Sequence, residues 1–177
     1  MIDPVISIPG SGVVLNCGVG TPHAARQFID WIPPCYVLMV FHTAFVAETV
    51  RGRETGQAGQ VLIDAPGTRE WHGGVGGEGF RNDWVHLASN AVDKPIGQAG
   101  LPLNQILTVS NPHLLSRIIA NMARERLLKE PNCEELLACR ATELILITGR
   151  LYRMTRKMTG SPMEHAHYER FCVIRQK

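Results

Sequence analysis

The stretch that decides the fold runs Gly59-Gln60-Val61-Leu62-Ile63-Asp64-Ala65-Pro66-Gly67-Thr68-Arg69-Glu70-Trp71-His72. It opens on a short apolar run, Val61–Ile63, and then reaches Pro66-Gly67, a pair that favours a turn. A second strand is expected to begin at Glu70. Because side chains alternate between the two faces of a strand, Glu70 and His72 share one face and Trp71 takes the other. The stretch therefore predicts two strands joined by a turn, with two polar side chains on one face.

The same character extends over the first hundred residues. Of the 17 glycines, 15 lie there, since only Gly149 and Gly160 lie beyond. Glycines and prolines separate short runs that are apolar or that alternate apolar with polar residues, which is typical of an antiparallel β-sandwich or barrel. The other such runs are Val13–Leu15, Tyr36–Val40, Phe45–Val50 and Trp84–Leu87.

From Asn111 onward the apolar period becomes helical. Asn111 can cap the N-terminus of a helix and Pro112 suits its first position. Pro131 ends this helix, and a second one is expected to run to about Lys157. Strands followed by helices predict the α+β class. The apolar face of the first helix is formed by Leu115, Ile118, Ile119 and Met122.

The second helix carries an apolar residue at every seventh position. This spacing suits a seam that packs against another helix. The seam could join two copies of the chain in a homodimer, or it could pack against the β part or the preceding helix, and one helix could do both. Gly149 inside the helix costs about 1 kcal/mol relative to Ala. The four seam residues are Leu137, Leu144, Leu151 and Met158.

Length and composition limit the classes of protein to consider. A chain of 177 residues suits one compact domain, or one domain with a small helical appendage. Its formal charge of +2 is small for a domain that binds nucleic acid by itself. No apolar run is long enough to span a bilayer, and the first residues lack the basic and apolar segments expected of a signal peptide. The five cysteines, an odd number without a C-x-x-C pair, indicate reduced thiols and a cytoplasmic location.

A second polar strand adds to the candidate site. Asn82, Trp84 and His86 share one face of the strand that holds them. If this face and that of Glu70 and His72 point into one barrel, a cavity receives hydrogen-bonding groups beside a flat aromatic ring. Such a cavity suits a polar ring-shaped ligand, for example a sugar. The alternative is that these residues are satisfied core or surface groups, as half-buried tryptophans often are.

A family resemblance rests on these motifs and their order. The glycine, apolar strand, Pro-Gly and histidine of the opening stretch resemble the second conserved motif of cupin barrels. Together with Asn82–Leu87 and the two helices, the stretch is similar to the arabinose-binding and dimerisation domain of AraC-type regulators. Tyr36–Phe41 resembles that family's strand leading into the barrel, and His165–Lys177 resembles the start of its helix-turn-helix region. The resemblance covers nearly the whole chain.

The resemblance implies a cupin-like β-barrel, or jelly roll, followed by an antiparallel pair of α-helices. Residues 1–100 would form the barrel, 101–158 the helical dimerisation part, and 159–177 a linker and the start of a truncated helix-turn-helix domain. The barrel would bind an effector, often a carbohydrate, without a metal or another cofactor, and the protein would not be an enzyme. The helices would dimerise, and DNA would be contacted only through the missing domain.

The resemblance also places the ligand contacts. Carried over position by position, they fall on Glu70, His72, Asn82 and Trp84, with Trp31 at the rim of the pocket. The family's arabinose-binding type carries an arginine where this chain has Trp31, so the effector of this chain is not expected to be arabinose itself.

Two alternatives remain from sequence. Cupins include metalloenzymes, and His42, Glu48 and His72 have the spacing of three of their metal ligands, although Ala44 replaces a fourth. A metal-dependent cupin enzyme is therefore one alternative. The other is a dimerisation module whose barrel binds nothing.

Overall fold

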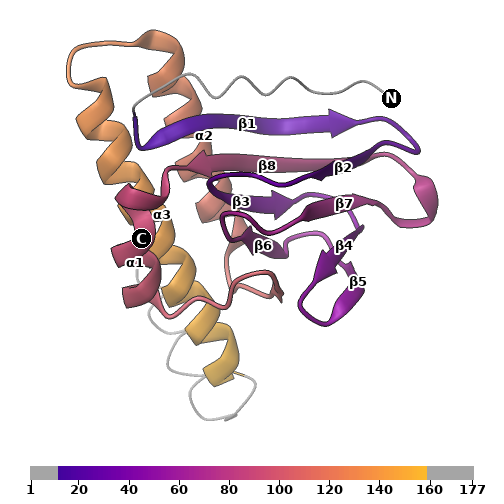
Figure 1. Cartoon of the computed structure of the whole chain (residues 1–177). Helices are drawn as coiled ribbons and strands as arrows, with labels where there is room; N and C mark the ends of the chain where they lie inside the picture. The colour runs from indigo at the N-terminus through magenta and orange to yellow at the C-terminus, as the bar shows by residue number, and fades with distance from the viewer. Residues whose placement is uncertain (1–11, 159–177) are drawn as a thin grey trace, which may run out of the picture.

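The computed structural model describes residues 12–158, which form two antiparallel β-sheets and three α-helices (Figure 1). The five-stranded sheet has the order β1 (Val14–His23), β8 (Phe80–Leu87), β3 (Tyr36–Phe41), β6 (Val61–Asp64) and β9 (Ile106–Leu107). The four-stranded sheet has the order β2 (Phe28–Trp31), β7 (Glu70–Gly74), β4 (Phe45–Thr49) and β5 (Gly52–Gly56). The predicted α+β class is confirmed. A closed barrel is not, because the strand pairs in the described part of the chain form two separate sheets.

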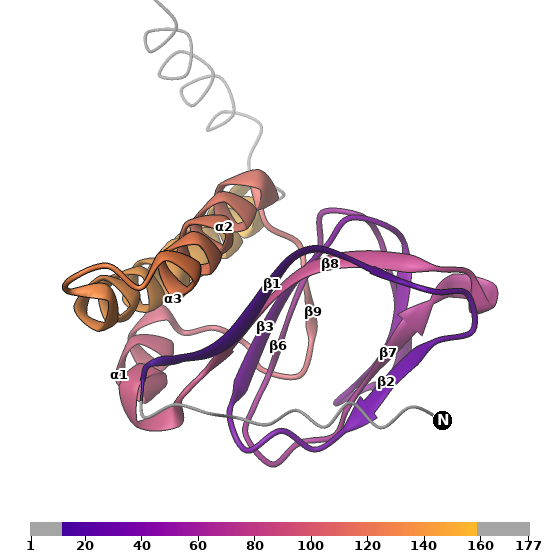
Figure 2. The ribbon, with the colours of Figure 1, turned by 90° about the horizontal axis from the view of Figure 1, so that it is seen from above.

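The two sheets face each other across an apolar layer (Figure 2). Phe41 of β3 and Phe45 of β4 bridge it, with ring centroids 3.5 Å apart and nearly parallel planes. Alternation along each strand directs every second side chain into this layer. The space between the sheets is therefore the interior of the β part. Its buried apolar residues are Leu15, Cys35, Val37, Met39, Phe41, Phe45, Ala47, Leu62 and Phe80.

The helices α1 (Ser89–Ala99), α2 (Pro112–Leu128) and α3 (Cys133–Met158) pack on the outer face of the five-stranded sheet (Figure 2). The predicted start of α2 is confirmed, since the Asn111 side chain accepts a hydrogen bond from the Leu114 backbone N–H at 3.3 Å. The predicted apolar face of α2 is buried against the sheet. Among the described residues, no helix combines the length and apolarity needed to cross a membrane.

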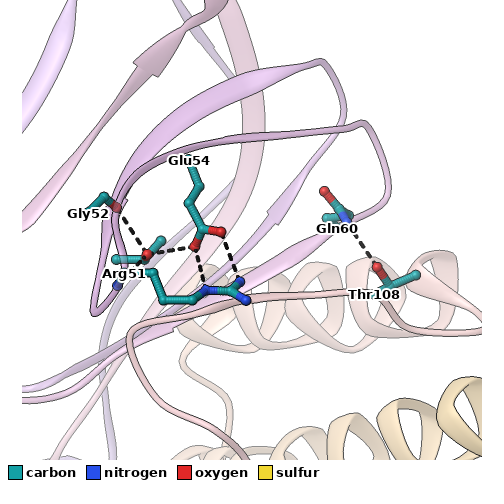
Figure 3. Close-up of polar contacts among 6 residues, drawn as sticks. Arg51, Gly52, Glu54, Gln60 and Thr108 are labelled. Carbon is teal, nitrogen blue, oxygen red and sulfur yellow. Dashed lines mark hydrogen bonds and ion pairs between the residues drawn. The ribbon is translucent and has the colours of Figure 1, made fainter.

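Several elements carry no sequence pattern that predicts them. Strand β5, Gly-Arg-Glu-Thr-Gly, has no apolar residue and depends on pairing with β4 and on polar contacts. There the Thr49 hydroxyl lies 2.6 Å from a Glu54 carboxylate oxygen, and Arg51 forms an ion pair with the same carboxylate at 2.9 Å (Figure 3). Near residue 100, α1 precedes the predicted boundary and β9 follows it, so strands and helices interleave there. The predicted linker and helix-turn-helix start, 159–177, lie outside the described residues.

The first three residues of the heptad seam of α3 face inward. Leu137, Leu144 and Leu151 are at most 5% exposed and belong to the apolar cluster between the helices and the five-stranded sheet. Met158 is the last residue of α3. The burial corresponds to the core-packing alternative, because side chains buried within one copy offer no surface to a second. The homodimer stays a prediction.

Gly149 lies where α3 touches α1. A Cβ added there would lie 2.8 Å from the Ala99 Cβ and 2.9 Å from the Ala99 carbonyl oxygen, closer than side chains pack. The glycine that costs helix propensity in the sequence thus permits close approach of two helices. Arg153, one turn further along α3, donates to the same Ala99 carbonyl at 2.5 Å.

We expect Gly149→Ala to destabilise the fold by about 1–3 kcal/mol, because overpacking outweighs the gain in helix propensity. Gly97→Ala in α1 is the matched change, since a Cβ at Gly97 meets nothing within 4 Å. It should stabilise by roughly 0.5–1 kcal/mol. Urea unfolding of both variants shows whether each change lowers or raises the free energy of unfolding. A stabilising Gly149→Ala would show that α1 and α3 are further apart.

Candidate functional site

All five residues predicted to contact a ligand lie between the two sheets. Glu70 and His72 come from β7, Asn82 and Trp84 from β8, and Trp31 from β2. Trp31 pairs with Glu70 across the β2–β7 ladder, and its indole N–H donates to Glu70 Oε2 at 2.8 Å. The structure therefore brings together residues that are up to 53 positions apart in the sequence, from Trp31 to Trp84. Their role in binding remains a prediction.

Three aromatic rings lie next to one another in the space between the two sheets. The His86 ring of β8 lies between two indoles, with its centroid 5.5 Å from that of Trp31 and 4.8 Å from that of Trp84. The Trp84 indole N–H donates to the Thr21 hydroxyl at 3.0 Å. Gly18 on the neighbouring strand allows this position, because a Cβ there would lie 2.5 Å from Trp84 Nε1. The two indoles are partly exposed, whereas His86 is buried.

The polar side chains around these rings are almost fully buried. His72 is 1% exposed, and its Nδ1 lies 3.5 Å from Glu70 Oε1, too far for a good hydrogen bond. Phe41 and Phe80 each meet the His72 ring edge-on, at 5.4 Å. Asn82, also 1% exposed, shares a hydrogen bond of 3.1 Å with His23.

Burial shifts the pKa of each of these groups towards its uncharged form. Desolvation, followed by repulsion from Asp64, raises the pKa of Glu70 to about 8 against the hydrogen bond from Trp31. Desolvation alone raises the pKa of Asp64 to about 7. The pKa of His72 falls to about 3 through desolvation and then the nearby His23, and that of His86 falls to about 4 through desolvation. At neutral pH Glu70, His72 and His86 are therefore mainly uncharged donors and acceptors, which suit an uncharged polar ligand, while Asp64 is partly ionised.

Three buried polar atoms of this interior have no hydrogen-bond partner among the described residues. They are Asp64 Oδ2, His72 Nδ1 and His86 Nδ1. Native proteins rarely leave such atoms unpaired, so each is available to a partner from beyond the described residues, such as a ligand or water. Asp64 was missed by the sequence reasoning, although alternation from Leu62 places it on the inner face of β6.

The three proposed metal ligands are not brought together. His42 follows the inward-facing Phe41 and therefore points to the outer side of the sheet, where its Nε2 lies 2.9 Å from Asp83 Oδ2. Glu48 lies on the outer face of the other sheet, 3.2 Å from Arg69, while His72 is interior. The prediction of a shared site for these three residues is wrong, because strand alternation separates them. No group of three metal-ligating side chains occurs within residues 12–158.

Among solved structures, the chain is similar to the AraC-like transcriptional activator CuxR. The TM-score is 0.45 and the identity 12%, over 64% of this chain and 42% of that one. It is also similar to the EutQ protein of Clostridium difficile, with a TM-score of 0.29 and 10% identity, over 37% of this chain and 52% of that one. The chain thus matches less than half the length of the activator. No family model matches the chain, and no curated protein matches it.

Proposed function

We propose that this chain is the effector-sensing domain of a bacterial transcription regulator of the AraC type. In this proposal a small uncharged polar molecule, best a carbohydrate, binds between the two sheets. The observation that carries the proposal is the cluster of buried, neutral hydrogen-bonding side chains beside two indoles. The motifs that resemble the AraC-type sensing domain give the regulatory role, in which an attached helix-turn-helix domain contacts DNA.

The chemistry of the cluster fits a sugar. A neutral imidazole offers one donor and one acceptor, and a protonated carboxyl group does the same. His72, His86 and Glu70 therefore match hydroxyl groups, which also donate and accept. The partly exposed faces of Trp31 and Trp84 suit the apolar C–H face of a sugar ring. Anionic ligands are disfavoured, because Asp64 is partly ionised at neutral pH while His72 and His86 are uncharged.

Strand β8 provides a route from the ligand to the helices. Its inner face carries Trp84 and His86, and its outer face carries Val85 and Leu87, which belong to the cluster beneath the helices. The strand continues through Ala88 into α1. A ligand that favours one position of β8 would therefore favour one arrangement of the helices. The proposal includes a homodimer formed by the helical part, which would transmit this preference to DNA.

A thermal-shift screen tests the binding step. Neutral monosaccharides, disaccharides and sugar acids are added to the protein, and the unfolding midpoint is measured. A ligand at about 100 times its dissociation constant adds roughly 2.7 kcal/mol, which raises the midpoint by about 5–10 °C in a domain of this size. We expect a selective shift with neutral sugars and a smaller one with sugar acids.

The matched variants are Trp84→Leu, between the sheets, and Trp71→Leu, on the outer face, where Trp71 stacks on Phe28 at 5.1 Å. Trp84→Leu should abolish the shift and Trp71→Leu should keep it, each measured against its own ligand-free midpoint. A shift that Trp71→Leu removes and Trp84→Leu retains would place the ligand on the outer face. An unfolding midpoint that no sugar raises would contradict the carbohydrate proposal.

A further inference from the structure

Helix α2 crosses β1 and β8 on the opposite side of the five-stranded sheet (Figure 2). Two adjoining hollows lie there. Their volumes are about 280 and 490 Å³, and they share His42 and Ser116. The smaller is lined otherwise by Val40, Phe41, Ala58, Gly59, Pro112 and His113. The larger adds Val19, Gly20, Arg81, Asp83, Arg117 and Ala120. Together they form one cleft between the sheet and α2.

The turn beside the cleft, between β5 and β6, is fixed by hydrogen bonds. The Gly59 backbone N–H donates to the Phe41 carbonyl at 2.8 Å. Gln60 donates through its side chain to the Thr108 hydroxyl at 2.9 Å, which ties this end of the sheet to the segment just before α2 (Figure 3). The cleft is therefore bounded by ordered backbone on the sheet side and by a capped helix on the other.

The cleft carries an excess of positive charge. Arg81 and Arg117 line the larger hollow, and neither side chain has an ion pair or hydrogen bond with any residue in the described range. The acidic lining residue is Asp83, which is buried and lies against Gly20 and His42 rather than against the arginines. Its Oδ1 accepts from the Gly20 backbone N–H at 2.6 Å, and its Oδ2 lies 2.9 Å from His42 Nε2. Two arginines thus line the hollow, and within the described residues no carboxylate forms an ion pair with either.

A further polar group lacks a partner at the junction of the two hollows. Ser116 Oγ is buried and forms no hydrogen bond with the residues described. It lies one turn into α2, whose N-terminal end carries a partial positive charge. The hydroxyl and the two guanidinium groups are donors arranged around one space. Beside them, Val40 and Pro112 provide an apolar wall.

We propose that this cleft is a second binding site, for the phosphate group of a small molecule. Arginine forks pair with phosphate oxygens in two-pronged hydrogen bonds, and a tetrahedral phosphate accepts from several directions at once. Arg81, Arg117 and Ser116 would hold the phosphate, and the apolar wall would contact an organic group attached to it. This site is separate from the space between the sheets, since Asp83 and Asn82 point to opposite faces of β8.

Isothermal titration with phenyl phosphate and with inorganic phosphate, at constant ionic strength, tests the site. Arg81→Gln and Arg117→Gln should each weaken binding at least about tenfold, the effect of losing a hydrogen bond to a charged group. Arg124→Gln is the matched control, because Arg124 lies two turns further along α2 and does not line the cleft. It should leave the affinity unchanged.

The titration distinguishes the class of ligand and can overturn the proposal. Tighter binding of phenyl phosphate than of inorganic phosphate assigns an organic phosphate ester, and equal binding assigns the phosphate ion. No heat with either probe, or equal weakening in all three arginine variants, would overturn the proposal. Its failure leaves the sugar site untouched, because that site is tested by Trp84→Leu and neutral sugars.

Discussion

Leu144→Ala is expected to lower the free energy of unfolding by about 2–5 kcal/mol, the cost of a large-to-small change in a well-packed core. Leu144 is fully buried in α3, in the cluster that joins the helices to the five-stranded sheet. Truncation removes apolar contacts and leaves a cavity that the surrounding strands and helices close only in part. Urea unfolding followed by circular dichroism measures the loss.

Leu146→Ala is the matched control on the same helix. Leu146 is 39% exposed, so its truncation should cost less than about 1 kcal/mol. Sedimentation velocity on both variants separates core packing from a dimer seam. If Leu144 formed a seam between copies, its truncation would dissociate a dimer while the monomer kept its stability, and the change would depend on protein concentration. Such a result would contradict the packing described here.

The inner face of the β part could be predicted because alternation depends only on the strand. Once β7 and β8 exist, Glu70 with His72 and Asn82 with Trp84 must lie on one face each. The start of α2 was equally predictable, since Asn111 and Pro112 act through local hydrogen bonding. Predictions of this kind succeed because the physical cause lies within a few residues.

Features that depend on distant partners could not be predicted. Strands β5 and β9 are too polar or too short to form alone and exist only through pairing with β4 and β6. Helix α1 contains Pro95, which argues against a helix in isolation, and packing against α3 stabilises it. The heptad of α3 was ambiguous for the same reason, because a periodic apolar stripe does not identify what covers it.

The metal-ligand prediction failed for a related reason. The spacing of His42 and Glu48 matches that of metal ligands, but His42 lies just after β3 and Glu48 lies on β4. Each side chain points to the outer side of its own sheet. Glu70 with His72 and Asn82 with Trp84 avoided this failure, since the residues of each pair share one face of one strand. Asp64 was still overlooked, because a carboxyl group at the end of an apolar strand is ordinarily a surface group.

The stability of the fold is expected to fall as pH rises, because the carboxyl group of Glu70 is buried. The pKa of Glu70 is about 8 in the folded chain, against an ordinary value near 4.5. Above pH 4.5 the unfolded chain loses this proton while the folded chain keeps it. The stability contributed by the group is therefore complete below pH 4.5 and is lost as pH rises towards 8, at up to about 1.4 kcal/mol per pH unit.

Other buried groups also contribute to the dependence of the unfolding free energy on pH. Asp64, whose pKa is about 7, acts in the same direction and adds to the loss above pH 4. His72 and His86 act oppositely, because their pKa values of about 3 and 4 lie below the ordinary 6.5. The unfolded chain binds protons at these histidines as pH falls below 6.5, so stability is lost on the acid side as well. The two pH windows overlap between about pH 4.5 and 6.5, where the opposite slopes cancel, so the stability maximum is expected in that range.

Glu70→Gln should remove the Glu70 part of the alkaline loss while keeping the hydrogen bond from Trp31, since a carboxamide oxygen also accepts. Between pH 5 and 8 the wild type should lose on the order of 3 kcal/mol more unfolding free energy than the variant. Urea unfolding at pH 5, 6.5 and 8 measures the difference. Glu48→Gln, on the outer face of the neighbouring strand, should keep the wild-type slope. Equal slopes for Glu70→Gln and the wild type would mean that Glu70 is ionised in the folded chain, and an interior holding that charge would select a cationic ligand over a neutral sugar.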